Sequence, residues 1–344
     1  MTRMKYTIKL LIALTGFVLA FGTGFAQNFS PLYPIGDDPD IKYVSSYTSQ
    51  EKILFEANPT VRYSFYSTFS RYLACEDRIH SQALYLAARP QLRMYQEVSK
   101  PVKTPSYRVF LGTQQLFRLN QGMNNKVVQF VGFSFESGHY SNGQSGCAFC
   151  EDYQDQTEEC DSIYATFDDN TDLSALLNRK NGNFSTNMSE LLLNYQWHKL
   201  DSTFSPVYSH SVELGYTLYH DRFLGVFDFG GYSDNDIGIY GRHRLMLNYE
   251  LTYKRQRKYA PTFAFRQNIE YILDHHVQVN PIRLVSTVTF YPIPAWRTFG
   301  VFTSYIYGHD NYNFRLVDSG HQFAVGLSWD QFAPAKLGGK RCKK

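Results

Sequence analysis

One alternating pattern dominates residues 127–143, which read VVQFVGFSFESGHYSNG. Its odd positions begin with mainly apolar side chains, whereas its even positions include Gly132, Ser134 and Glu136. Side chains two residues apart lie on the same face of a β-strand, so one face is apolar and the other is small or polar. The pattern predicts a strand of more than ten residues, which is long enough to cross a bilayer at a tilt.

The same pattern returns from about residue 59 to the end of the chain. Nine ranges show it clearly: 107–117, 127–139, 189–197, 211–219, 245–253, 263–273, 282–291, 296–307 and 322–329. Further strands near 60–73 and 82–96, and an obscured one near 223–233, bring the expected total to about twelve. Repeated alternating segments joined by short and long turns are typical of a transmembrane barrel. We therefore predict an all-β chain whose residues 59–332 form an antiparallel up-and-down β-barrel.

Composition agrees with this prediction and narrows the alternatives. The chain has 27 Tyr and 27 Phe, yet its mean hydropathy is only -0.36. Barrel strands produce this combination because lipid-facing and lumen-facing residues alternate and cancel in an average. After the N-terminal segment no run approaches 18 consecutive apolar residues, which excludes helical membrane spans on hydropathy. A soluble β-sandwich stays open as an alternative. A net charge of +3 does not indicate a nucleic-acid partner.

The two ends of the chain have their own signals. Residues 1–26 resemble a secretory signal peptide, with a basic start, an apolar run at 10–21 and small residues before a cleavage site after Ala26. An uncleaved start is the alternative. Residues 27–58 are an N-terminal extension of unassigned role, and residues 333–344 form a short basic tail. Export predicts a compartment that permits disulfides, and for a barrel the destination is the bacterial outer membrane.

The cysteines concentrate in one insertion. The five are Cys75, Cys147, Cys150, Cys160 and Cys342, so at least one thiol stays free or pairs between chains. Three of them lie in the acidic segment 144–183, which we predict to be an outer loop pinned by a disulfide. A bound cation in this loop is the alternative. Zinc is poorly supported, because three cysteines lack a fixed fourth ligand.

The chemistry-bearing residues lie at the end of the first quoted strand. His139 and Ser141 continue the odd row, so they are expected side by side on the lipid-facing surface. A serine hydroxyl becomes a useful nucleophile when a neighbouring imidazole takes its proton. Two interfacial polar residues at a strand end are the plain alternative.

A second strand adds an amide to this pair. Residues 187–197 read NMSELLLNYQW, and Asn187 shares a face with the apolar positions, whereas Glu190 lies on the opposite face. If residues 144–183 form an outer loop, the two strands are antiparallel neighbours and Asn187 can meet His139. An amide there would hold the imidazole in the correct tautomer. Asn181 and Asn183 precede the alternating pattern and remain rivals.

These residues resemble the outer-membrane phospholipase A family. His139-Tyr140-Ser141-Asn142-Gly143 is similar to that family's H-x-S-N-G motif, and Ser185-Thr186-Asn187 is similar to its S-x-N. Weaker similarities to the sequences of that family extend from about residue 85 to the end of the chain. The resemblance implies that Ser141 is the nucleophile, His139 the general base, Asn187 the group orienting His139, and Gly143 an oxyanion-hole amide. One departure concerns Asn187, because roughly forty residues separate it from Ser141, where the family has about a dozen.

The resemblance also implies a function, a cofactor and a partner. The expected activity is hydrolysis of phospholipid acyl esters in the outer membrane, of A1 or A2 type. Calcium would be held by Ser99 and by the backbone carbonyl of Gln144, and the active form would be a dimer. Two alternatives stay open. A lipid A deacylase also has an H-x-S-N motif, but it uses a glutamate and a smaller barrel of eight strands. The other is a non-enzymatic pore or structural barrel.

Overall fold

The computed structural model describes residues 35, 39–45, 52–96, 102, 105–120, 126–227, 230–254, 261–292, 299–329, 336–339 and 342. The expected signal peptide lies outside the described residues, and so does Ser99. Within the described ranges, no helix is long and apolar enough to serve as a membrane span.

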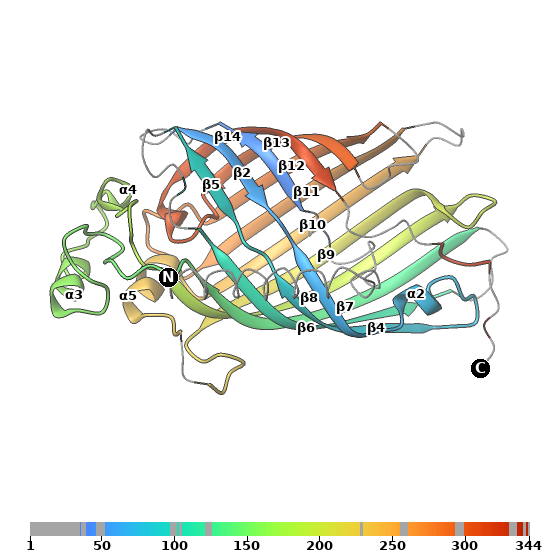
Figure 1. Ribbon diagram of the computed structural model, residues 1–344, viewed down its shortest axis with the longest axis horizontal. Helices are drawn as coiled ribbons and strands as arrows, with labels where there is room; N and C mark the ends of the chain where they lie inside the picture. Colours follow the sequence, from blue (N-terminus) through green and yellow to red (C-terminus); the bar gives the residue numbers. More distant parts are fainter. Residues whose placement is uncertain are drawn as a thin grey trace, which may run out of the picture.

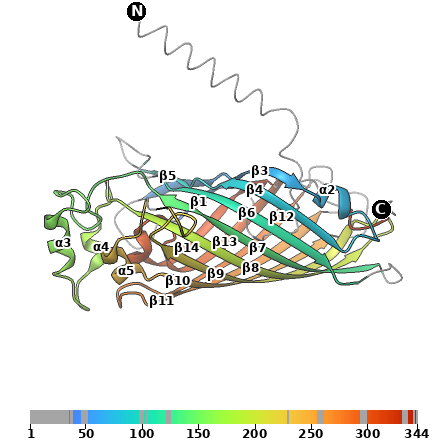
Figure 2. The ribbon, with the colours of Figure 1, turned by 90° about the horizontal axis from the view of Figure 1, so that it is seen from below.

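Fourteen strands form one antiparallel sheet in the order β3-β4-β6-β7-β8-β9-β10-β11-β12-β13-β14-β1-β2-β5. From β6 to β14 each strand pairs with its neighbour in sequence, which is the up-and-down arrangement. Figures 1 and 2 show strands on the near and far sides of the molecule in both views, so the sheet is rolled. The bounds are β1 Asp40–Val44, β2 Ile53–Asn58, β3 Val61–Ser67, β4 His80–Ala88, β5 Leu92–Tyr95, β6 Tyr107–Arg118, β7 Val127–Ser141, β8 Ser185–Leu200, β9 Pro206–His220, β10 His243–Lys254, β11 Thr262–Leu273, β12 Ile282–Tyr291, β13 Phe299–His309 and β14 Ser319–Trp329.

The count of fourteen exceeds the expected twelve because two strands are broken at prolines. β2 gives way to β3 across Pro59, and β4 gives way to β5 across Pro90. A proline has no N–H to donate to the ladder, so pairing is interrupted there. β2 pairs with β5, and β3 pairs with β4. β3 and β5 stand at the two ends of the strand order. Along the chain, β3 continues β2, and β5 continues β4.

Two expectations about individual segments need correction. The prediction of a strand near 223–233 was wrong. The described residues of this range form a short hairpin and then lead into helix α5, Asp234–Tyr240. The apolar residues of that hairpin imitate a strand in the sequence. Conversely, β1 and β2 join the sheet from within residues 27–58, which were expected to be an extension. At five and six residues, these strands are too short for a recognisable alternation.

The two faces of the rolled sheet differ in chemistry. In β7 the even row, which includes Ser134 and Glu136, is buried, whereas Phe133 and Phe135 are exposed. The buried face lines a cavity of about 370 Å³, to which β1 and the strands from β8 to β14 all contribute. Charged side chains bridge this interior: Arg89 pairs with Glu136 at 2.6 Å. The outward face is the apolar one, as the alternation predicted.

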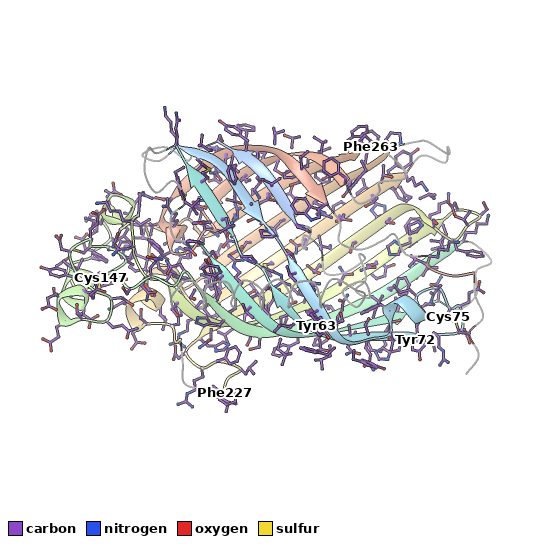
Figure 3. All side chains as sticks on the ribbon, in the orientation of Figure 1. Tyr63, Tyr72, Cys75, Cys147, Phe227 and Phe263 are labelled. Atoms are coloured by element: carbon purple, nitrogen blue, oxygen red, sulfur yellow. A yellow bond between two sulfur atoms is a disulfide. The ribbon has the colours of Figure 1, made fainter. Side chains whose placement is uncertain are left out.

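The connections gather at two ends. Helices α3 (Glu158–Tyr164), α4 (Leu173–Leu176) and α5 lie together at one end, and helix α2 (Phe69–Tyr72) lies at the other (Figure 1). Within the described ranges, a further short helix is η3, Arg315–Val317. One disulfide joins Cys147 to Cys160 and another joins Cys75 to Cys342. Figure 3 labels Cys147 and Cys75 at opposite ends of the molecule. Each end of the sheet therefore has its own covalent link.

Candidate active site

β7 and β8 bring His139 and Asn187 directly opposite each other. The two strands pair without a register shift, and His139 faces Asn187 across the ladder. Their side chains meet at 3.0 Å between His139 Nδ1 and Asn187 Oδ1. Despite the long insertion between the strands, the structure thus brings Asn187 to His139. Asn181 Oδ1 accepts from Asn178 at 2.9 Å, and Asn183 donates to Asp155 at 2.6 Å, both within the 144–183 segment.

The other half of the Asn187 amide determines the tautomer of the histidine. Asn187 Nδ2 donates to the backbone carbonyl of Asp221 at 2.9 Å, so Oδ1 is the atom that faces the imidazole. An amide oxygen only accepts, and His139 Nδ1 must therefore carry the proton. The proton on Nδ1 leaves Nε2 of the neutral ring with its lone pair. A histidine in this state can act as a base through Nε2.

Ser141 lies two residues beyond His139 on the same outward face. It stands opposite Ser185 in the β7–β8 ladder and is half-buried. Among the described residues, the Ser141 hydroxyl forms no hydrogen bond, so the His139–Ser141 contact that a triad needs is not made. Catalytic hydrogen bonds are often long before substrate binds. The structure joins the histidine to its amide and leaves the hydroxyl next to them.

A glycine turn follows Ser141 directly. Gly143 has φ +66, which is a left-handed backbone that glycine adopts without strain, and a Cβ there would meet nothing within 4 Å. The turn is fixed by the buried Asn142, whose Oδ1 accepts from the amides of Gln144 and Phe184 at 3.2 and 3.1 Å. Within the described part of the chain the Gly143 amide has no acceptor. It is available to a ligand beside Ser141.

A calcium site does not take shape among the described residues. Of the two expected ligands only Gln144 is described, and calcium takes six to eight oxygens. Three cysteine, histidine or acidic side chains come within ligand distance of one another at a single place in the described ranges, Cys75, Asp77 and Cys342. Both sulfurs there belong to a disulfide. These residues do not fit calcium, and no chemistry is derived through it.

The 144–183 segment forms an outer cap of short helices rather than a cation site. Cys147 is bonded to Cys160, as the expected pinned loop requires, and Cys150 keeps a free thiol. Among its acidic side chains, Glu151 pairs with Lys180. The described residues of this segment give no support to the alternative of a bound cation or zinc.

Three further polar residues on the outward face were missed by the sequence analysis. The hydroxyls of Ser137 and Ser189 meet at 2.9 Å, and Ser189 meets His220 Nε2 at 2.9 Å. His220 ends β9 and pairs with Asn187 across the ladder. Its place at the end of an alternating row, beside Ser189, was the signal that could have identified it. The outward polar patch therefore spans β7, β8 and β9.

The chain that follows β9 packs against this patch. The carbonyl of Gly230 accepts from Ser185 at 3.2 Å. A Cβ placed on Gly230 would come within 2.4 Å of His139 Cε1, so the backbone at Gly230 touches the imidazole edge. Together with the Asp221 carbonyl, this contact explains why Asn187 is fully buried although it belongs to the outward row. A tight glycine approach thus helps to hold the His139–Asn187 pair.

Outside the sheet, one buried carboxyl in α5 has a raised pKa. Asp236 in α5 accepts from the Tyr164 hydroxyl of α3 at 3.2 Å. Burial, and next the nearby charge of Asp155, raise the pKa of Asp236 to about 7. Because an ionised carboxylate is poorly solvated in this position, the contact between α3 and α5 favours the neutral acid.

Comparisons with known proteins give structural similarity of low score. No family model matches the chain, and no curated protein matches it. Outer membrane phospholipase A from Escherichia coli is 9% identical over 87% of this chain and 92% of its own, with a TM-score of 0.47. A Salmonella typhi outer membrane phospholipase dimer with bound calcium is 9% identical over 88% of this chain and 94% of its own, with a TM-score of 0.46. The NanC porin is 9% identical over 85% of this chain and 99% of its own, with a TM-score of 0.36. At these values the similarity carries no argument about function.

Proposed function

We propose that this chain is a closed outer-membrane β-barrel that hydrolyses phospholipid acyl esters with Ser141, His139 and Asn187. The carrying observation is the His139–Asn187 hydrogen bond of 3.0 Å on the outward face, with Ser141 next on that face. An outward histidine held by an amide beside a serine is the arrangement that nucleophilic acyl transfer needs.

The membrane location is supported by the outward face itself. Large exposed hydrophobic side chains recur on strands all round the sheet, among them Tyr43, Phe65, Leu214 and Phe323, which are exposed by 55% or more. A soluble monomer rarely exposes an apolar patch larger than a few hundred Å². A bilayer would cover this band, and the polar patch of β7–β9 lies at the end of those strands that carries the outer cap.

The reaction would proceed through an acyl-enzyme. Ser141 Oγ attacks the ester carbonyl while its proton passes to His139 Nε2, and the Gly143 amide stabilises the oxyanion. The resulting imidazolium protonates the departing lysophospholipid oxygen, which breaks the ester bond. Water, deprotonated by His139, then attacks the acyl-serine, and the fatty acid leaves as Ser141 recovers its proton. Asn187 keeps Nδ1 protonated throughout.

The two alternatives lack matching residues. A deacylase of the glutamate type would need a carboxylate beside His139, but Glu190 lies on the inner face, where it lines the cavity and accepts from Thr217 at 3.2 Å. A pore would need an open interior. Here the inner face carries buried ion pairs beside the cavity, such as Arg93 with Glu56 and Asp310 at 2.5–2.6 Å.

Ser141→Ala tests the proposal directly. Purified protein in mixed micelles of phospholipid and detergent should release fatty acid, and Ser141→Ala should lower the rate by about 10³-fold or more. Thr303→Ala is the matched control, because it removes an outward hydroxyl on β13, away from the polar patch. Equal losses in both variants, or full activity in Ser141→Ala, would contradict the assignment.

Calcium dependence and dimerisation stay predictions of the resemblance. The same assay with calcium and then with a chelator measures the first. Crosslinking in detergent at rising protein concentration measures the second. Neither result changes the roles proposed for Ser141 and His139.

A further inference from the structure

Residues 221–227 form a compact hairpin immediately after β9, here called the apolar hairpin. Phe223 and Phe227 exchange backbone hydrogen bonds of 2.8 and 2.9 Å, which closes a loop of three residues. Leu224 and Gly225 in that loop have φ of +52 and +74. Turns of this kind favour glycine and asparagine. Leu224 therefore occupies a backbone region that is uncommon for residues other than glycine.

The tip of the apolar hairpin faces outward with little protein cover. Val226 is 71% exposed and Phe227 is 55% exposed. Figure 3 shows Phe227 at the tip of a loop that projects sideways from the wall of the rolled sheet. Exposing two adjacent apolar side chains to water at such a tip costs free energy. We therefore expect an apolar partner to cover them.

The base of the apolar hairpin is part of the site. Its first residue, Asp221, accepts from Asn187 Nδ2 through its backbone carbonyl. Gly230, which follows the hairpin, touches the His139 ring and accepts from Ser185. A movement of the apolar hairpin would therefore change the contacts of Asn187 and His139, the pair in which the histidine tautomer is set.

The chemistry around the tip matches a lipid surface. The neighbouring outward rows of β8 and β9 are apolar and exposed, with Leu191 at 42% and Leu214 at 56%. Arg222 is exposed at the base of the same hairpin, and Arg242 lies within 3.9 Å of Asp221. An apolar tip beside an exposed basic residue such as Arg222 fits a segment that lies in the membrane interface.

We propose that the apolar hairpin inserts Leu224, Val226 and Phe227 among the acyl chains of the outer leaflet and thereby delivers a phospholipid ester to Ser141. Arg222 contacts the phosphate of the headgroup layer. Insertion would fix the position of Asp221 and Gly230, and with them the His139–Asn187 pair. The catalytic part of this inference rests on the proposed function, whereas the insertion does not.

Insertion is measured by placing a tryptophan at the tip. Phe227→Trp and, as a control, Tyr153→Trp are reconstituted in phospholipid vesicles with and without brominated acyl chains, and the emission of the parent protein is subtracted. Tyr153 is 40% exposed in the 144–183 segment, outside the membrane band. We expect brominated lipid to quench Trp at 227 at least threefold more than Trp at 153. Equal quenching at the two positions would overturn the inference, whether or not the protein is an esterase.

Delivery is measured by comparing two substrates. The double variant Val226→Ser/Phe227→Ser should lower the ratio of vesicle phospholipid hydrolysis to short-chain soluble ester hydrolysis by about tenfold, mainly through KM. Leu176→Ser, at an exposed leucine of α4, is the control and should leave this ratio unchanged. An unchanged ratio in the double variant would overturn the delivery role. Absence of all ester hydrolysis in the parent protein would instead reject the proposed function.

Discussion

The outward face carries histidines in two different settings. In the polar patch of β7–β9, His139 is held by an amide and His220 by a hydroxyl. Elsewhere on the same face, His80 meets the Gln115 amide oxygen at 2.7 Å, and three other histidines pair with tyrosine hydroxyls at 2.6–2.7 Å: His210 with Tyr249, His243 with Tyr216 and His321 with Tyr305. Two of these pairs are also stacked. His210 and His243 lie toward opposite ends of the paired strands β9 and β10.

The partner of each histidine explains the difference. A phenol can donate or accept, so a Tyr–His pair tolerates either tautomer of the ring. Asn187 tolerates only one, because Asp221 fixes which end of the amide faces His139. Residue type and location are therefore insufficient evidence of catalysis. A histidine whose tautomer is imposed by a second hydrogen bond, and which lies beside a serine on the same face, is the better candidate.

The largest expected effect separates the two settings. His139→Ala should lower ester hydrolysis by at least about 10³-fold, because among the described residues it is the base next to Ser141 on that face. His321→Ala removes a histidine of a Tyr–His pair and should change the rate by less than about threefold. Initial rates on a soluble ester measure both. Comparable rates in the two variants would erase the distinction drawn here.

Asn187→Ala should have the next largest effect, about 10²-fold, because His139 then loses the group that imposes its tautomer. Glu190→Ala, on the inner face three residues later, is the control. The pH dependence of the rate should also change in Asn187→Ala, which a purely structural loss would not cause. A larger loss in Glu190→Ala would favour the deacylase alternative.

Gly230→Ala tests the contact between the chain after β9 and the imidazole. The new methyl would lie 2.4 Å from His139 Cε1, so the ring must move, and we expect a loss of about 10- to 10²-fold. Gly225→Ala introduces the same left-handed strain at a position where nothing lies within 4 Å. Soluble-ester turnover of the two variants isolates the displacement of the ring from strain. Equal effects would show that only strain matters.

The smallest expected effect concerns the outer cap. Because the pKa of Asp236 is raised to about 7, its contribution to docking α5 on α3 is complete below about pH 3.8 and is lost as pH rises through about 7. Limited proteolysis of the cap should therefore be roughly tenfold faster at pH 8 than at pH 6. Asp236→Asn should remove most of this pH dependence. Persistence of the full change in the variant would point to another group.

The sequence predicted the long strands and the shared face of the proposed site residues for one reason. Alternation places His139, Ser141 and Asn187 on one face, and strong alternation survives without knowledge of neighbours. What it missed depended on contacts distant in sequence. β1 is defined by pairing with β14, and the buried state of Asn187 depends on residues after β9. The apolar hairpin was misread because Phe223 to Phe227 has strand-like composition and turn-like backbone angles.

The Cys75–Cys342 disulfide has a consequence for how this molecule is made. It joins residues 267 positions apart, so every strand from β4 to β14 lies inside a single covalent ring. Closing a ring of this size would stabilise the folded state by about 5 kcal/mol in the chain-entropy description. The ring can form only once the final residues have emerged, after β14 is available to pair with β1. Formation of the Cys75–Cys342 disulfide would thus be a late step of assembly. A reductant present during assembly should leave the paired strands able to separate again.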